Sequence, residues 1–454
     1  MPTLEPFSRC PGRTTVIRSG RFAVSLLSPM AGALVLLAVF LSPVLADPGR
    51  GHVASRPDEE FPQFRVNDDI TGEENRRDPA MVALENGNVL VAWIDGSRGQ
   101  RDILVREFTA ALEPLGEPRR LNDDHAFAAQ WDVYLGRPAS GRVAAVWRDN
   151  RAGREEIYLQ TLSTVDGAPL GTNIRIDDYN SDVERLSPEV ATSSLGTSLV
   201  VWTDHRVVEH RVYCRLVNAQ GQVEGPNRTV VPEHDDSFQA NPTVAALPDG
   251  RWIVAWDERP DEADAGGTVY YRFLAADGSP LAPIMPISEQ QAPQRDPAVL
   301  VQADGIFLVW SDDREREGEL WGRWLTLEGA AETEPARIRT AAGTARDRDP
   351  RIVAGLDGSF AVTWFGSIEN RERAFARWYQ SDRSPAGPEF PLQDPNPGAT
   401  VYMHSGDVAP GPPDSGSWIV AWSDDWTQAE QVFLDLADPA TGPQGSRVQA
   451  WSMP

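Results

Sequence analysis

Residues 241–259 read NPTVAALPDGRWIVAWDER, and the same arrangement recurs six more times along the chain. In each copy a short apolar segment follows a polar residue, a turn comes next, and a second apolar segment ends on a tryptophan. The seven tryptophans are Trp93, Trp147, Trp202, Trp256, Trp310, Trp364 and Trp422. They lie 54 or 55 residues apart, except for a last interval of 58. A fixed period of this length is typical of a repeat protein in which each copy is one structural unit.

Each copy contains four short segments with the composition of β-strands. The turn before the tryptophan contains a glycine, as in Asp249-Gly250, and glycine tolerates the positive φ of a tight hairpin. A third segment such as TVYYRFL (268–274) is rich in β-branched and aromatic residues, and a shorter fourth segment follows another turn. We therefore predict an all-β fold, a seven-bladed β-propeller of four-stranded antiparallel blades, with the tryptophans packed between blades.

The residues before the repeats predict export. Arg13, Arg18 and Arg21 precede an apolar run, AGALVLLAVFL (31–41), which is short for a membrane span, and small residues follow it. We predict a signal peptide over 1–46, a linker over 47–60 and the propeller over 61–454; an uncleaved anchor is the alternative. The segment 64–69 matches the fourth strand of other copies, so we expect it, rather than residues 447–450, to complete the seventh blade.

Charge and cysteine content limit the expected partners. The chain has 67 Asp and Glu against 42 Lys and Arg, a net charge of −25. Such a surface repels phosphate backbones and anionic lipids, which argues against nucleic acids and, after signal cleavage, against membranes. Cys214 is the one cysteine of the predicted mature chain, so no internal disulfide is expected. We expect a monomer that is secreted, periplasmic or on the cell surface and meets an extracellular protein or a glycan.

The repeated unit, DPxV followed by VxWxDxR and VYxRL, resembles the propeller repeats of bacterial secreted and cell-surface proteins and, more distantly, TolB-type propellers. The resemblance covers nearly all of residues 61–454 and implies the propeller fold, without implying a particular activity. The chain lacks the Ser-x-Asp-x-Gly-x-Thr-Trp motifs of sialidases.

Acidic residues at the start of the first strands are the candidates for ligand binding, because first strands line the channel of a propeller. They are Asp78, Asp132, Asp296, Asp349 and Asp407. Counting across the hairpin places Asp78 opposite Asp95, and three other copies repeat the pairing. Opposed acids need a bridge, either the arginine that follows the second acid or a Ca²⁺ ion. Because the arginine recurs with the acid, we favour the ion pair and assign neither a metal site nor a cofactor.

Residues that occur once, rather than in every copy, are the candidates for catalysis. Two histidines share one predicted loop, a third lies in a neighbouring connection, and a histidine and a tyrosine precede the last repeat. These residues are His205, His210, His234, His404 and Tyr402.

The sequence leaves two functions open. The first is a secreted or cell-surface module that binds a ligand or partner through its acidic loop face. The second is a secreted carbohydrate-active hydrolase or lyase with its site at the central mouth of the propeller. The sequence does not decide whether the chain is an enzyme. A deep cavity where non-repeating polar side chains converge would favour the second function.

Overall fold

In the computed structural model the chain divides into residues 1–59 and 60–454, and every described residue belongs to the second unit. The described residues are 64–65, 76–96, 101–124, 128–180, 183–206, 210–234, 237–260, 266–289, 292–315, 318–340, 346–355, 357–368, 371–392, 406–411, 415–424 and 431–443. The predicted signal peptide and linker lie outside them.

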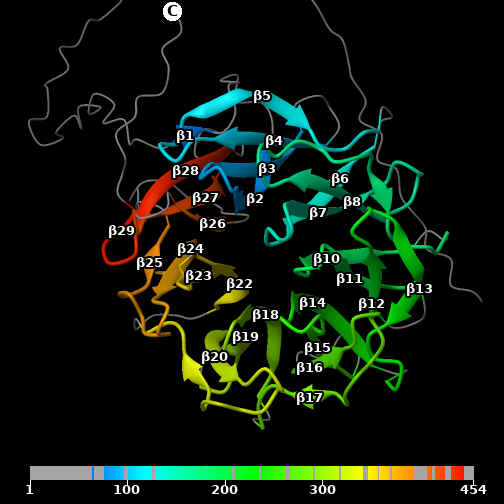
Figure 1. The fold of residues 1–454 in the computed structure, drawn as a ribbon. Helices are drawn as coiled ribbons and strands as arrows, with labels where there is room; N and C mark the ends of the chain where they lie inside the picture. The colour runs from blue at the N-terminus through cyan, green and yellow to red at the C-terminus, as the bar shows by residue number, and fades with distance from the viewer. Residues whose placement is uncertain are drawn as a thin grey trace, which may run out of the picture. The chain divides into compact units, whose positions relative to one another are not determined.

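Seven antiparallel sheets form a ring, as predicted (Figure 1). The innermost strands are β2 (Arg76–Ala83), β6 (Gln130–Leu135), β10 (Arg185–Thr192), β14 (Phe238–Ala246), β18 (Gln294–Gln302), β22 (Arg348–Ala354) and β26 (Gly406–Pro410). The second strands are β3 (Val89–Asp95), β7 (Arg142–Asp149), β11 (Ser198–Asp204), β15 (Trp252–Arg259), β19 (Gly305–Asp312), β23 (Phe360–Ile368) and β27 (Trp418–Asp424). Each second strand carries one of the seven repeated tryptophans.

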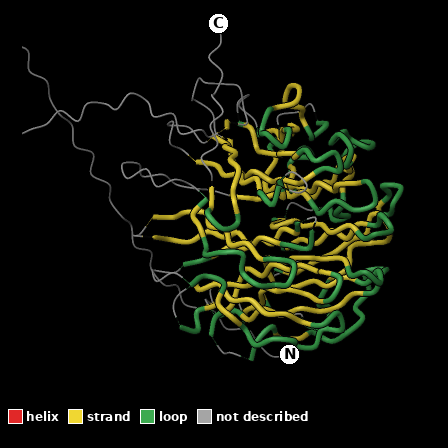
Figure 2. The backbone as a smooth tube through the Cα atoms, turned by 60° about the vertical axis from the view of Figure 1, so that its left-hand side comes forward, coloured by secondary structure: helices red, strands yellow, loops and turns green. Residues whose placement is uncertain are grey.

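The outer half of each blade is shorter in several copies. The third strands are β4 (Asp102–Phe108), β8 (Glu156–Ser163), β12 (Arg211–Val217), β16 (Thr268–Leu274), β20 (Glu319–Leu325), β24 (Arg371–Tyr379) and β28 (Gln431–Asp438). The fourth strands of blades one to six are β5 (Pro114–Arg120), β9 (Ile174–Arg175), β13 (Val223–Thr229), β17 (Met285–Pro286), β21 (Ala336–Arg337) and β25 (Phe390–Pro391). The described residues contain strands, loops and turns (Figure 2), and none forms a helix that could span a bilayer.

The N-terminal strand closes the ring, as the sequence predicts. Strand β1 (Phe64–Arg65) pairs with β28 of the seventh blade, with Phe64 opposite Leu434. Farther along β28, the short strand β29 (Gly442–Pro443) pairs with it as well. Residues 447–450, the alternative closing strand, lie outside the described residues.

A hydrophobic cluster fills each of the seven interfaces between neighbouring blades. Every cluster contains one repeated tryptophan, and each of these tryptophans is at most 1 % exposed. The cluster between blades seven and one, for example, joins Met81 and Trp93 to Ile419 and Val432. The apolar faces of the sheets are therefore buried around the whole ring, which confirms the predicted role of the tryptophans.

An acidic residue two positions after the tryptophan fixes the indole ring. In the second blade, Trp147 Nε1 donates a hydrogen bond to Asp149 Oδ2 at 3.0 Å, and Arg151 Nη2 donates to the same oxygen at 2.7 Å. The third and fifth blades repeat this arrangement. The predicted arginine bridge therefore exists, but it does not join two acids of one hairpin. Arg151 pairs with Asp149 at its own strand end and donates at 2.6 Å to Asp123, which follows the fourth strand of the first blade.

The sixth blade keeps the carboxylate although the sequence position is Gly366. Asp347, which precedes strand β22, places its carboxyl group beside the side chain of Trp364, and Arg339 Nη1 donates to Asp347 Oδ1 at 2.7 Å. A Cβ atom at Gly366 would lie 2.2 Å from that oxygen. The missing side chain makes the room that Asp347 fills.

The predicted pairing of acids across the hairpins is wrong, because the ladder beside the turn is already one position off the predicted count, with Val82 opposite Leu90, and a β-bulge then shifts it again. Arg76, rather than Asp78, lies opposite Asp95, and the register shifts between Arg77 and Ala80. The bulge residue adopts a left-handed conformation with φ of 50–56° in six blades, at Asp78, Asp132, Ser187, Asn241, Asp296 and Asp349. Asp and Asn tolerate this conformation better than most residues. In the seventh blade Asp407 lies opposite Ala421 rather than Asp424, because Pro410 pairs with Trp418 and the hairpin connection is therefore two residues longer than in the first blade, where Ala83 pairs with Val89.

We expect Trp202→Ala to lower the free energy of unfolding by about 3–5 kcal/mol, because it empties a filled interface between blades. Trp202 is fully buried, stacks on Tyr213 at 6.2 Å and donates to Asp204. Chemical denaturation measures the change. Leu195→Ala is the control, since Leu195 is 78 % exposed and should change stability by less than about 0.5 kcal/mol. Equal effects of the two variants would contradict the role of the indole.

Candidate functional site

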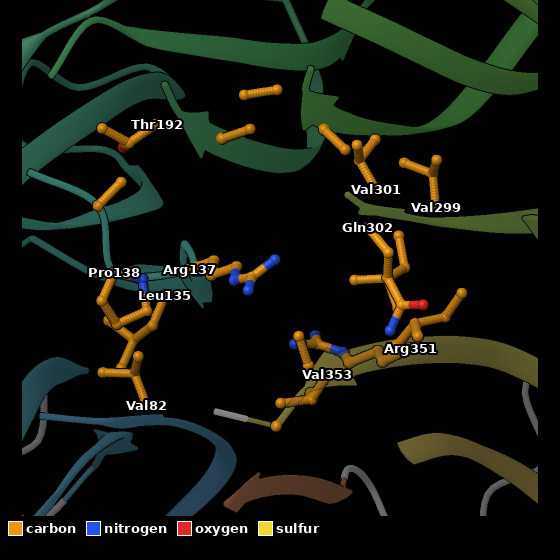
Figure 3. A pocket seen from close by; sticks show the side chains of 18 of the residues that line it. Val82, Leu135, Arg137, Pro138, Thr192, Val299, Val301, Gln302, Arg351 and Val353 are labelled. Carbon is orange, nitrogen blue, oxygen red and sulfur yellow. The ribbon is translucent and has the colours of Figure 1, made fainter. Parts of the chain in front are cut away.

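A cavity of about 1240 Å³ lies inside the ring and is lined by the innermost strands of all seven blades. Figure 3 shows side chains that surround it, with Arg137 and Arg351 pointing into the space. Its lining includes the turns between first and second strands, at the opposite end of the strands from the acidic loop face. The walls are mostly apolar, with Val82, Leu135, Val190, Val244, Val299 and Val353 among them.

One position of the innermost strand supplies most of the polar side chains at the bottom of this cavity. In each blade this position pairs with the residue immediately before the repeated tryptophan, and in the bulged strands it is the first paired residue after the bulge. Its occupants from blade one to blade seven are Ala80, Tyr134, Glu189, Thr243, Ala298, Arg351 and Asp407. We call these seven residues the inner ring. Unlike the tryptophans, they differ from blade to blade, so the ring brings distinct chemical groups together.

Glu189 is held between the two neighbouring blades. Thr243 Oγ1 donates to Glu189 Oε1 at 2.9 Å, the backbone N–H of Val244 donates to the same oxygen at 3.4 Å, and the Tyr134 hydroxyl bonds to the carboxyl group as well. Burial raises the pKa of Glu189 to about 7. At neutral pH the group therefore exists in both protonation states, as a general acid requires.

Asp407 and Arg351 form the other half of the polar floor. Met81 N–H donates to Asp407 Oδ2 at 2.8 Å and Val408 N–H to Oδ1 at 2.9 Å. Burial raises the pKa of Asp407, whereas the Arg351 guanidinium and these two N–H groups act against the rise and favour the carboxylate. Arg351 also lies 5.4 Å from the centre of the Tyr134 ring, so a residue of blade six reaches blade two.

A second cluster of polar side chains lies at the bulge positions of the fourth and fifth blades. Asn241 Nδ2 donates to Asp257 Oδ1 and to Asp296 Oδ1, each at 2.9 Å. Burial and the neighbouring Asp349 and Asp257 carboxylates raise the pKa of Asp296 to about 8, and burial raises that of Asp257 to about 6. These two carboxyl groups share one amide and are partly protonated at neutral pH.

The five acidic residues predicted to bind a ligand therefore lie in three different environments. Asp78, Asp132 and Asp349 lie at bulge positions beside arginines, at 3.5, 2.8 and 3.7 Å from Arg77, Arg148 and Arg348 respectively. Asp296 joins the Asn241 group. Asp407 belongs to the inner ring, because the hairpin connection of the seventh blade is two residues longer than that of the first and moves Asp407 two positions relative to the other acids.

The histidines predicted as catalytic candidates also lie in different places. The rings of His205 and His210 lie 4.3 Å apart between centroids. His234 Nδ1 instead hydrogen-bonds to Glu258 Oε1 at 2.6 Å. His404 and Tyr402 lie outside the described residues.

Sequence reasoning missed Tyr134, Glu189, Thr243, Arg351 and Asp257. The signal was nevertheless present in the sequence. Four of these residues, Tyr134, Glu189, Thr243 and Arg351, directly follow the proline or valine of a short apolar strand. The residues at the same position in blades one and five are alanines. A charged or hydroxyl-bearing residue at a position that is otherwise small marks a departure from packing.

No protein-family model matches the chain, and no curated protein matches it in sequence. Solved structures do align with it. A protein of unknown function from Dyadobacter fermentans aligns with a TM-score of 0.49 and 10 % identity over 69 % of this chain and 98 % of its own. An α-L-arabinanase of Penicillium chrysogenum complexed with arabinobiose gives 0.47 and 15 % over 69 % and 95 %.

The GH93 α-L-arabinofuranosidase of Fusarium graminearum, also with arabinobiose, gives a TM-score of 0.48 and 12 % identity over 71 % of this chain and 99 % of its own. At such identities and scores these likenesses carry no argument about this chain, and its function has to be argued from its own residues. The resemblance to TolB-type propellers stays a prediction.

Glu189 should make stability depend on pH. Its pKa is about 7 in the folded chain against an ordinary 4.5, so the folded state binds the proton more tightly and loses stability as pH rises from about 4.5 to 7. We expect the wild type to lose roughly 2–3 kcal/mol relative to Glu189→Gln between about pH 5 and pH 8. Denaturant unfolding at both pH values measures this difference. Glu117→Gln, at an exposed site, should show none.

Proposed function

We propose that the propeller is a hydrolase that cleaves a glycosidic bond in the central cavity. The observation that supports it is the inner ring, which places a protonatable carboxyl group, Glu189, and a second carboxyl group, Asp407, on the floor of one cavity. Glycoside hydrolysis needs a pair of carboxyl groups in different protonation states. The ring also departs from the sevenfold repetition, which a packing role would not require.

In this proposal Glu189 is the general acid. It gives its proton to the glycosidic oxygen as the bond to the anomeric carbon breaks, so that the leaving sugar departs as an alcohol. The hydroxyl groups of Thr243 and Tyr134 both bond to this carboxyl, and they hold it in one orientation. Water replaces the leaving group at the anomeric carbon, and its proton restores the enzyme.

Asp407 is the second carboxyl group, which assists the attack on the anomeric carbon. Its hydrogen bonds to two backbone N–H groups and the nearby positive charge of Arg351 favour the ionised form. Burial raises the pKa of both carboxyl groups, and Arg351 opposes the rise at both, most directly at Asp407. In this proposal Asp407 acts as the carboxylate and Glu189 as the acid.

A binding module without chemistry is the second candidate, and the apolar walls favour it. Valine, alanine, leucine and proline side chains dominate the lining, as in sites that hold a ligand by burial with a few polar groups to orient it. In that case the site is the cavity rather than the acidic loop face named from the sequence.

Hydrolysis of a panel of 4-nitrophenyl glycosides and of plant and microbial oligosaccharides tests the proposal. We expect turnover by the wild type, a 10²–10⁴-fold lower kcat for Glu189→Gln and for Asp407→Asn, and a fall in kcat as pH rises through about 7. Glu117→Gln is the matched control and should keep wild-type activity. Turnover that survives both cavity substitutions would refute the assignment, and saturable glycan binding without turnover would establish the binding module.

Export is a separate proposal, which rests on residues 13–46. Expression of the full chain in a Gram-negative bacterium, followed by N-terminal sequencing of the protein from the periplasm or the medium, tests it. We expect a mature chain that begins at Asp47. Retention of residues 1–46 on a membrane-bound product would indicate the uncleaved anchor instead.

A further inference from the structure

Two histidines of the connection between β11 and β12 and a glutamate from the segment before β10 converge at one end of the third blade. Glu184 precedes strand β10, His205 follows β11, and His210 precedes β12. One nitrogen of each histidine and one carboxylate oxygen of Glu184 all lie within 4.8 Å of one another. In the part of the chain that the structure describes, no other trio of His, Cys, Asp or Glu brings its ligand atoms this close together.

The backbone holds these residues in place. His205 N–H donates to the carbonyl oxygen of Glu184 at 3.0 Å, which ties the first two segments together. Gln239 N–H donates to the carbonyl oxygen of His210 at 2.9 Å, and the His210 ring packs on Phe238 with 4.4 Å between centroids. The two imidazoles are therefore positioned by hydrogen bonds and packing that involve the main chain of neighbouring strands.

Within the trio His210 Nε2 lies 3.8 Å from Glu184 Oε2, and the trio differs from the other histidine site in accessibility. His210 is buried, His205 is partly buried and the Glu184 side chain is 63 % exposed, so the group opens to solvent on the glutamate side. His234, one blade along, is engaged by Glu258 at 2.6 Å. None of the three residues lines the central cavity.

We propose that Glu184, His205 and His210 bind one divalent transition-metal ion, of which Zn²⁺ suits them best. Two imidazole nitrogens and one carboxylate oxygen form a ligand set that zinc prefers, whereas Ca²⁺ and Mg²⁺ prefer oxygen ligands alone. Ligands 2.0–2.1 Å from a tetrahedral ion are about 3.4 Å apart. The three ligand atoms, which lie within 4.8 Å of one another, therefore have to draw closer together around the ion, with water as the fourth ligand.

The site is new relative to the sequence analysis, which assigned no metal. The histidines were recognised as neighbours in one loop, but Glu184 lies about 20 residues earlier and joins them only because β10 and β11 are adjacent strands. The proposal does not depend on the hydrolase, because its ligands lie outside the cavity.

Equilibrium dialysis of the chelator-treated protein against Zn²⁺ tests the site. We expect one Zn²⁺ per chain in the wild type, affinity at least 100-fold lower for His205→Ala, and about 10-fold lower for Glu184→Gln. His234→Ala is the matched control and should bind Zn²⁺ like the wild type. Co²⁺ substitution gives a second readout, a visible absorption spectrum of tetrahedral type that His205→Ala abolishes.

Absence of stoichiometric Zn²⁺ binding by the wild type would overturn the proposal. So would equal affinities for His205→Ala and His234→Ala, since these would place the ion elsewhere. Because His210 packs in the protein, a His210 variant could fail to fold, and the decisive variants are therefore the partly buried His205 and the exposed Glu184. Circular dichroism confirms that each variant retains the all-β spectrum.

Discussion

One tryptophan packed into each interface between blades is the interaction on which the rest of the structure depends. A single four-stranded blade leaves two apolar faces in water, and only contact with a neighbour on each side buries both. The carboxylate that accepts the indole N–H fixes the ring, and the arginine that follows neutralises that carboxylate. The sixth blade shows what the interface requires, because Asp347 supplies the carboxylate where the usual position is Gly366.

The sequence sufficed to predict the blades because burial acts on every copy in the same way. The spacing of the tryptophans, the glycine turns and the spare strand near residue 64 each follow from a local pattern. The pairing of residues across each hairpin could not be predicted in this way, because counting from the turn assumes a fixed turn length and an uninterrupted ladder. Asp and Asn at the bulge position tolerate a positive φ, so the residue types predicted as ligands were partly there for the backbone conformation.

The candidate site could be predicted only in part, for a different reason. A search for recurring residues finds what packing requires, whereas Glu189 and Arg351 stand out by not recurring. Asp407 was a candidate because the count across the hairpin placed it opposite Asp424, whereas it lies opposite Ala421. Its place on the cavity floor depends on a hairpin connection that is two residues longer than in the first blade, and the pairing register of the strands reveals that difference. The seven blades therefore share one backbone arrangement, whereas the side chains of the inner ring differ from blade to blade.

The pairing of β1 with β28 has a consequence for how the molecule is made. The outer edge of the last blade is filled by residues that leave the ribosome first, and their partner strand is synthesised about 370 residues later. Until then the nascent chain holds six blades and an unpaired N-terminal segment, and the contact that joins its two ends is among the most distant in sequence. Circularity is therefore completed only after translation has passed residue 434, and a shortened product would remain an arc with two uncovered sheet faces.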